Sequence, residues 1–208
     1  MTCIKICGIT NAEDAIKAVE LGANMLGFIF AESKRRVDIS TVKNICRIIG
    51  PDIKTVGVFV EETEEILRAL DECGLSYIQL HGNQSEQMAQ RIGCESVIRV
   101  ARVKDAEDIE NLKNYSCASF YLLDTYKKGL AGGTGEIFDW DLALLAHNLE
   151  KPFLLSGGLN TDNICDAIDK VKPFGVDISS GVESSPGIKD HNKLKELIEN
   201  VRKADSAS

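Results

Sequence analysis

The sequence predicts an α/β protein with a single domain, a closed (β/α)8 barrel in which eight parallel strands are surrounded by helices. Two observations carry this prediction. Short apolar runs alternate along the whole chain with longer segments whose apolar residues recur at helical spacing. Eight such runs occur, and they recur about every 25 residues, which is the length of one strand, one helix and two short loops.

The predicted strands are runs of mainly apolar, β-branched and aromatic residues, such as TVGVFV and FYLL. Each run is followed by small or polar residues that are typical of turns. In chain order the predicted strands are Cys3–Cys7, Met25–Phe30, Thr55–Val60, Tyr77–Leu80, Val97–Val100, Phe120–Leu123, Phe153–Leu155 and Gly175–Ile178.

The segments between the strands show helical periodicity and recognisable ends. Asn11 is a capping residue before AEDAIKAVEL, and Gly22 is a typical C-terminal stop. Further helices are predicted over Glu62–Cys73 and after the capping residues Asp139, Thr161 and Asp190, with weaker patterns at Thr41–Ile49, Ser85–Ile92 and Lys104–Asn114.

The alternative fold for this pattern is an open, doubly wound sheet. Its dinucleotide-binding fingerprint GxGxxG is missing, because the first turn from strand to helix has the sequence CGIT at residues 7–10. No linker or change of composition marks a second domain. We therefore expect one barrel domain over residues 1–203, followed by a frayed C-terminal tail at residues 204–208.

The composition excludes several classes of partner. The net charge of -8 argues against nucleic acid or an anionic membrane as a partner, and no stretch approaches the ~18 apolar residues of a membrane span. The cysteines form no CxxC pair and no Cys/His cluster with zinc spacing, so we expect no metal and reduced thiols in a cytoplasmic protein. The seven cysteines are Cys3, Cys7, Cys46, Cys73, Cys94, Cys117 and Cys165.

Three reactive side chains are predicted at the carboxyl ends of the strands, where the active sites of this fold lie. Alternation along a strand makes Cys7, Asp124 and His81 face inward at the ends of the first, sixth and fourth strands. A thiol, a carboxyl and an imidazole at one mouth form a catalytic pattern. Each also has a simpler interpretation, because a free cysteine can be a core residue, an aspartate can cap a turn, and a histidine before glycine can be a loop residue.

Two charged residues are predicted inside the barrel. Lys5 on the first strand and Asp177 on the eighth both have inward parity, and these strands are neighbours when the barrel closes. An unpaired buried charge is very costly, so we expect an ion pair or a water-bridged pair between them. Arg99 on the fifth strand has the same inward parity by our count.

Two loops of small residues follow the last two strands. Gly157 and Gly158 follow the seventh strand, and Ser180 and Gly181 follow the eighth. In (β/α)8 barrels these loops are the recurrent phosphate site, because their backbone N–H groups can approach an anion closely. Ordinary glycine turns are the alternative. A third loop, Lys127–Glu136, contains four glycines and is predicted to be a mobile lid.

Nine stretches of the sequence resemble phosphoribosylanthranilate isomerase, an enzyme family of tryptophan biosynthesis. They occur in the family's order and span nearly the whole chain. The stretches are KICGIT (Lys5–Thr10), GFIF (Gly27–Phe30), SKRRV (Ser33–Val37), VGVFV (Val56–Val60), IQLHG (Ile78–Gly82), LLDT (Leu122–Thr125), GGTG with FDW (Gly132–Trp140), LSGGLN (Leu155–Asn160) and VDISSGVESSPGIKD (Val176–Asp190).

The resemblance implies a (β/α)8 or TIM barrel that converts N-(5-phosphoribosyl)anthranilate into 1-(2-carboxyphenylamino)-1-deoxyribulose 5-phosphate. This Amadori rearrangement is an internal redox step, so no cofactor is implied. The family's general base corresponds to Cys7 and its general acid to Asp124. Its carboxylate-binding arginine corresponds to Arg35 by the Ser-x-Arg-x-Val pattern, with Arg36 as the alternative because the loop looks one residue short.

Two other kinds of function stay open on this fold. A different phosphosugar enzyme is one, but a metal-dependent epimerase needs inward His and Asp ligands on several strands, and by our count only His81 qualifies. A barrel that binds phosphometabolites or a protein without catalysis is the other. Our expectation is an enzyme with a small-molecule phosphoribosyl substrate, present as a monomer or homodimer.

Overall fold

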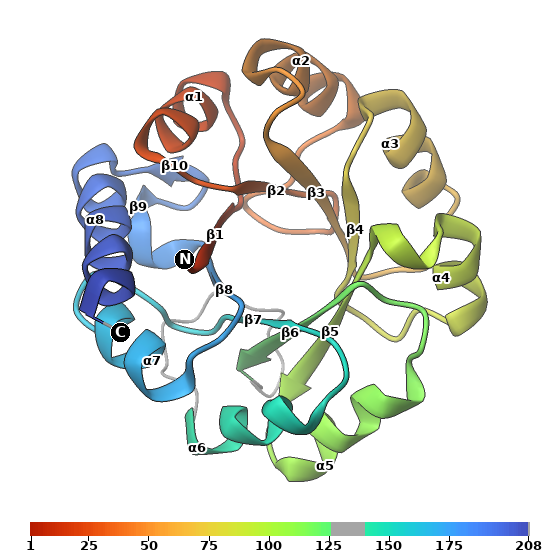
Figure 1. Ribbon diagram of the computed structural model, residues 1–208. Helices are drawn as coiled ribbons and strands as arrows, with labels where there is room; N and C mark the ends of the chain where they lie inside the picture. Colours follow the sequence, from red (N-terminus) through yellow and green to blue (C-terminus); the bar gives the residue numbers. More distant parts are fainter. Residues whose placement is uncertain (126–139, 208) are drawn as a thin grey trace.

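The computed structural model describes residues 1–125 and 140–207 and has the predicted closed barrel of eight parallel strands (Figure 1). Each strand pairs with its neighbour in chain order, and β8 closes the barrel on β1, where Lys5 lies opposite Asp177. The strands are β1 Cys3–Cys7, β2 Met25–Ile29, β3 Lys54–Phe59, β4 Tyr77–Leu80, β5 Val97–Val103, β6 Phe120–Thr125, β7 Phe153–Leu155 and β8 Gly175–Ile178.

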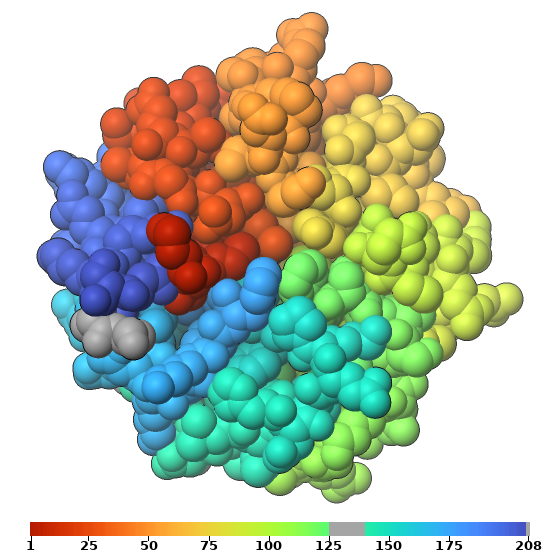
Figure 2. Space-filling model, in the orientation of Figure 1, coloured from red at the N-terminus to blue at the C-terminus, as the bar shows by residue number. Residues whose placement is uncertain are grey.

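The helices form a ring outside the strands (Figure 1). They are α1 Ala12–Leu21, α2 Ile39–Ile49, α3 Glu65–Cys73, α4 Glu86–Ile92, α5 Ala106–Glu110, α6 Trp140–Ala143, α7 Ile164–Val171 and α8 His191–Ala207. Sequence order continues around the molecule, so that α8 comes to lie against α1 (Figure 2). Asn11, Asp38 and Ser85 accept a backbone N–H as caps of α1, α2 and α4. The predicted start after Thr161 is wrong, because α7 begins at Ile164.

Two apolar clusters stabilise the barrel. A large cluster lies between the strands and the helices, and a smaller one fills the interior with Met25, Val56, Ile98, Leu122 and Leu154. Complete burial of such a side chain stabilises the fold by about 1.5–3 kcal/mol. Because side chains fill the interior, a ligand has room at the mouth of the barrel and not in its middle.

The prediction that Arg99 points inward is wrong. Ile98 and Val100 belong to the interior cluster, so alternation along β5 turns Arg99 toward the helices. There its guanidinium lies 3.7 Å from the centre of the Tyr115 ring, and Nη1 donates a hydrogen bond to the Gln84 carbonyl at 2.6 Å. A ring face and a carbonyl, instead of a carboxylate, stabilise this buried cation.

The prediction of a frayed tail also needs correction, because α8 continues to Ala207. Ala204 is buried against the rest of the protein. The Asp205 carboxylate accepts hydrogen bonds from the Thr2 backbone N–H at 2.8 Å and from its hydroxyl at 2.6 Å. These hydrogen bonds hold the end of α8 against the start of β1 and stabilise its last turn.

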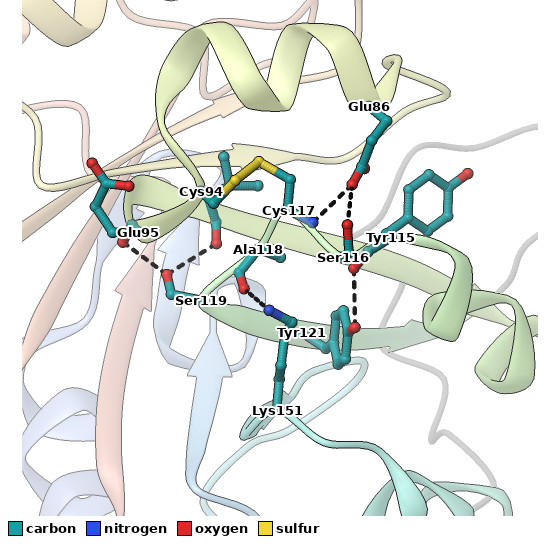
Figure 3. The surroundings of a disulfide bond; sticks show 11 residues. Glu86, Cys94, Glu95, Tyr115, Ser116, Cys117, Ala118, Ser119, Tyr121 and Lys151 are labelled. Carbon is teal, nitrogen blue, oxygen red and sulfur yellow. Dashed lines mark hydrogen bonds between the residues drawn. A yellow bond between two sulfur atoms is a disulfide. The ribbon is translucent and has the colours of Figure 1, made fainter.

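A disulfide corrects the expectation that every cysteine is reduced. It joins Cys94, before β5, to Cys117, before β6, with the Cα atoms 4.4 Å apart (Figure 3). The Glu86 carboxylate accepts hydrogen bonds from the Cys117 N–H at 2.8 Å and from the Ser116 hydroxyl at 3.0 Å (Figure 3). The remaining cysteines, Cys3, Cys7, Cys46, Cys73 and Cys165, are free thiols. The spacing of Cys94 and Cys117 in the sequence gave no signal for the disulfide, because the two residues are not separated by the short distances that mark a CxxC or zinc site.

Reduction of this disulfide is expected to destabilise the protein without changing its activity. A cross-link that closes a loop over the sequence separation of 23 residues contributes about 3 kcal/mol to the free energy of unfolding, or a Tm change of roughly 6–12 °C. Calorimetry of Cys94→Ser/Cys117→Ser tests this, with Cys46→Ser as the free-thiol control. Thiol titration of the denatured, unreduced protein should find the five free cysteines; all seven reactive would contradict the disulfide.

Candidate active site

A single pocket at the carboxyl ends of the strands brings together most of the sequence-predicted site residues. It receives side chains from β1, β3, β4, β6 and β8 and from the loops after β2, β7 and β8. The predicted residues that line it are Cys7, Arg35, His81, Asp124, Gly157, Gly158, Asp177 and Ser180. Lys5, Arg36 and Gly181 are not among its lining residues.

Cys7 ends β1 and is almost completely buried in the pocket wall. The neighbouring position on β2 is Gly27, where a Cβ atom would lie 2.8 Å from the Cys7 sulfur. Glycine at this position therefore makes room for the thiol. Burial raises the pKa of the Cys7 thiol, Lys5 acts in the opposite direction, and Asp177 reinforces the rise.

The predicted Lys5–Asp177 ion pair is present below the pocket. Lys5 Nζ lies 2.7 Å from Asp177 Oδ1, and the Lys5 side chain is completely buried. Burial lowers the pKa of Lys5, but the negative charge of Asp177 and the Cys7 group outweigh burial and raise it overall. The Ser156 hydroxyl lies 3.3 Å from the other Asp177 oxygen. A charged amine thus lies beneath the pocket, next to the Cys7 thiol.

Asp124, His81 and Gln79 form a row of polar groups on the other side of the pocket. Asp124 lies near the end of β6, and its Oδ2 is 3.3 Å from His81 Nε2. The Gln79 amide nitrogen lies 3.1 Å from His81 Nδ1. With Nδ1 on Gln79, the other ring nitrogen of His81, Nε2, is the one that lies toward Asp124. His81 lies in the loop directly after β4, and its side chain lines the pocket together with Asp124.

The two adjacent arginines point in different directions. Arg35 lines the pocket, and its side chain is 16% exposed. Arg36 is 53% exposed and lies 3.4 Å from the exposed Glu32. Gly8 explains how Arg35 enters, because its φ of +77° suits glycine and a Cβ atom there would lie 2.8 Å from Arg35 Cδ. The geometry therefore favours Arg35 over Arg36 as a residue that can touch a ligand.

Two charged residues of the site were missed by the sequence analysis. Glu183 and Lys189 follow β8, are both buried, and contact Arg35 and the Cys7 carbonyl respectively. Burial raises the pKa of Glu183, but Arg35 and Lys189 outweigh it and lower the pKa overall, whereas burial lowers the pKa of Lys189. The only signal in the sequence is that a glutamate and a lysine stand within the stretch VESSPGIKD, where no periodic pattern shows that they are buried.

The two small-residue loops lie side by side at the mouth. Gly157 and Gly158 have φ values of +90° and +71°, which only glycine adopts readily. At Gly181 a Cβ atom would lie 2.0 Å from the Leu159 carbonyl oxygen, so glycine there lets the loop after β8 pack on the loop after β7. Ser180 faces the pocket instead. The predicted lid at Lys127–Glu136 lies outside the described residues.

Neither a metal cluster nor a membrane span is found within residues 1–125 and 140–207. This part of the chain contains no group of three or more His, Cys, Asp or Glu side chains that could hold a metal ion. None of its helices is both long enough and apolar enough to cross a membrane.

Comparison with protein families identifies relatives over nearly the whole chain. Residues 4–200 match the family model described as N-(5'phosphoribosyl)anthranilate (PRA) isomerase. The N-(5'-phosphoribosyl)anthranilate isomerase of Geotalea uraniireducens is 43% identical over 204 residues, covering 97% of this chain and 99% of the relative. That of Citrifermentans bemidjiense is 44% identical over 205 residues, covering 98% of each.

Solved structures give the same result. The crystal structure of phosphoribosyl anthranilate isomerase from Thermotoga maritima superposes with a TM-score of 0.89 at 40% identity, covering 98% of this chain and 100% of that one. A second structure of such an isomerase, in complex with reduced 1-(o-carboxyphenylamino)-1-deoxyribulose 5-phosphate, superposes with a TM-score of 0.85 at 40% identity and the same coverage.

Proposed function

The chain belongs to the N-(5'-phosphoribosyl)anthranilate isomerase family, and from this membership we propose which of its residues carry the family's reaction. The protein is an isomerase of tryptophan biosynthesis that converts N-(5-phosphoribosyl)anthranilate into 1-(2-carboxyphenylamino)-1-deoxyribulose 5-phosphate. The observation that supports our assignment is that Cys7 on β1 and Asp124 on β6 line one pocket with both small-residue loops.

Asp124 is proposed to be the general acid that opens the sugar ring. The furanose ring oxygen leaves C1 as the anthranilate nitrogen forms a Schiff base, and it needs a proton to do so. A protonated Asp124 supplies that proton and becomes a carboxylate. His81 is the polar group beside the new charge, with its Nε2 3.3 Å from Asp124 Oδ2.

Cys7 is proposed to be the general base of the second step. The Schiff base loses its C2 proton to the Cys7 thiolate, which gives an enolamine that rearranges to the ketone. Burial raises the pKa of the Cys7 thiol, and the positive charge of Lys5 acts against this rise, which increases the fraction of thiolate. The positive iminium charge of the bound intermediate acts in the same direction.

The ends of the substrate are both anionic, and we propose a separate site for each. The phosphate binds at the loops of Gly157, Gly158 and Ser180, where backbone N–H groups and glycine conformations suit an anion. The anthranilate carboxylate binds to Arg35, whose planar guanidinium can donate two parallel hydrogen bonds. A cytoplasmic location and a monomer or homodimer remain part of this proposal.

The pair Arg35 and Arg36 offers a test within one loop. Arg35→Met is expected to raise KM about 10- to 100-fold, because a charged hydrogen-bonded pair with the substrate carboxylate contributes roughly 1.5–3 kcal/mol. Arg36→Met should leave KM within about twofold, because exposed ion pairs such as Arg36–Glu32 contribute little. Initial rates as a function of substrate concentration measure both. The reverse pattern would assign the carboxylate to Arg36 instead.

A further inference from the structure

A buried charge network lies behind Arg35 and has no part in the chemistry described above. It belongs to the hairpin that follows β8, made of β9 (Glu183–Ser185) and β10 (Ile188–Lys189). Glu183 and Lys189 stand at the two ends of this hairpin and are 8% and 4% exposed. Their burial requires compensating partners, and those partners are residues of the site.

Glu183 contacts one particular edge of the Arg35 guanidinium. Arg35 Nε lies 2.8 Å from Glu183 Oε1, and Nη2 lies 2.7 Å from Oε2, which is a bidentate pair. This pair uses the edge formed by Nε and Nη2. A guanidinium has one other edge with two parallel N–H groups, the edge formed by Nη1 and Nη2. Glu183 therefore fixes which edge of Arg35 remains for a second carboxylate.

Lys189 holds Glu183 to the end of β1. Its buried Nζ donates to Glu183 Oε1 at 3.0 Å, to the Cys7 carbonyl at 2.7 Å and to the Ser179 carbonyl at 3.2 Å. These three acceptors use all three hydrogens of the ammonium group. The network therefore connects the backbone that carries the Cys7 thiol to the side chain of Arg35.

The hairpin is itself fixed independently of any ligand. The Asp14 carboxylate on α1 accepts the Lys189 backbone N–H at 2.9 Å, and the Thr10 hydroxyl donates to the Gly187 carbonyl at 2.5 Å. These contacts keep Glu183 in place beside Arg35 whether or not a ligand is bound.

We propose that Glu183 is a positioning residue for substrate binding, which aims the Nη1–Nη2 edge of Arg35 at the substrate carboxylate and is held in place by Lys189. This inference rests on the proposed role of Arg35. Glu183 touches no reacting atom in it, and its effect passes through the orientation of the guanidinium. Without Glu183, Arg35 stays charged but is free to adopt other rotamers, so substrate binding becomes weaker while the rate of the chemical steps is unchanged.

The test is a set of four variants measured by steady-state kinetics and by titration with reduced 1-(2-carboxyphenylamino)-1-deoxyribulose 5-phosphate. Glu183→Gln is expected to raise KM and the Kd of this analogue about tenfold while kcat stays within about threefold, because ground state and transition state lose the same contact. Glu183→Asp keeps the negative charge on a shorter side chain, so its KM and Kd should lie between those of wild type and of Glu183→Gln. If Glu183→Gln does not fold, Glu183→Asp takes its place in the test.

Two further variants distinguish positioning from a merely structural role. In an Arg35→Met background, adding Glu183→Gln should change KM and Kd by less than about twofold, because its effect passes through the missing arginine. The matched control is Glu64→Gln, which breaks an exposed bidentate pair with Arg91 at 3.0 and 2.9 Å on the surface. It is expected to leave KM, kcat and Kd unchanged.

The outcomes separate this inference from the proposal on which it rests. If Arg35→Met raises KM but Glu183→Gln does not, the positioning role is wrong and the role of Arg35 stands. A full Glu183→Gln effect in the Arg35→Met background would equally overturn positioning through Arg35. If Arg35→Met leaves KM unchanged, the carboxylate site itself is wrong and the inference fails with it.

Discussion

Replacement of Cys7 with serine is expected to lower kcat by roughly 10³-fold or more, because removal of a positioned general base costs about 10²–10⁴-fold and a hydroxyl ionises far less readily than a thiol. The substrate site keeps its shape, since serine fits where the sulfur lies beside Gly27. The measurements are single-turnover rates and the Kd of the reduced product analogue, which should stay within about threefold of wild type.

The pH profile gives an independent test of the same assignment. Burial raises the pKa of the Cys7 thiol, with Asp177 acting in the same direction and Lys5 against it. The base is active when deprotonated, so its contribution is present above this pKa and is lost as pH falls through it. Because Asp124 must be protonated at the same time, the wild-type kcat/KM depends on both groups, and its profile should contain an ionisation on the alkaline side of neutrality that belongs to Cys7. The residual activity of Cys7→Ser should lack that ionisation.

Cys3 is the matched control for this experiment. It lies on the same strand and has the same inward parity, but at the opposite end of the barrel from the pocket. Burial raises the pKa of its thiol to about 11, and it does not line the pocket, so it cannot reach the C2 proton. Cys3→Ser is expected to keep full turnover. A Cys7→Ser enzyme within tenfold of wild type would show that another group removes the C2 proton.

The barrel was predictable because its strands obey local rules. Alternation along a strand needs no long-range information, so the inward parity of Lys5, Cys7 and Asp177 could be counted from the sequence. The Lys5–Asp177 pair then followed from one global fact, that the first and last strands of a closed barrel are neighbours. The same counting failed at Arg99 although the strand begins at Val97 as predicted, because Val97 and Ile98 are both apolar and the run does not show which of them faces inward.

The parts that could not be predicted depend on contacts between distant segments. Glu183 meets Arg35 across 148 positions of the sequence, through a hairpin whose strands are only two or three residues long. No periodic pattern marks such short strands. The Cys94–Cys117 disulfide depends likewise on two segments that meet just before β5 and β6 begin. Local pattern thus located the catalytic strands, but not the groups that hold their side chains in place.

Replacement of Asp124 with asparagine is expected to have an effect as large as that of Cys7→Ser, but on the first step of the reaction. An amide has nearly the shape of the carboxyl and can still contact His81, which lies 3.3 Å away in the native enzyme. It cannot donate a proton to the ring oxygen, so kcat should fall by roughly 10³-fold while the Kd of the reduced product analogue changes little.

The two variants are distinguished by the step at which the substrate stops. In Asp124→Asn the substrate should remain a closed furanose, whereas Cys7→Ser should let the ring open and then fail to exchange the C2 hydrogen. Substrate deuterated at C2 separates the two variants. Cys7→Ser should show a primary isotope effect, because removal of the C2 proton limits its rate. Asp124→Asn should show none, because ring opening limits its rate. Asp162→Asn, an exposed aspartate in the turn before α7, is the control for loss of a carboxylate near the mouth. A large isotope effect in Asp124→Asn, or turnover close to wild type, would remove Asp124 from the ring-opening step and leave His81 as the group to test next.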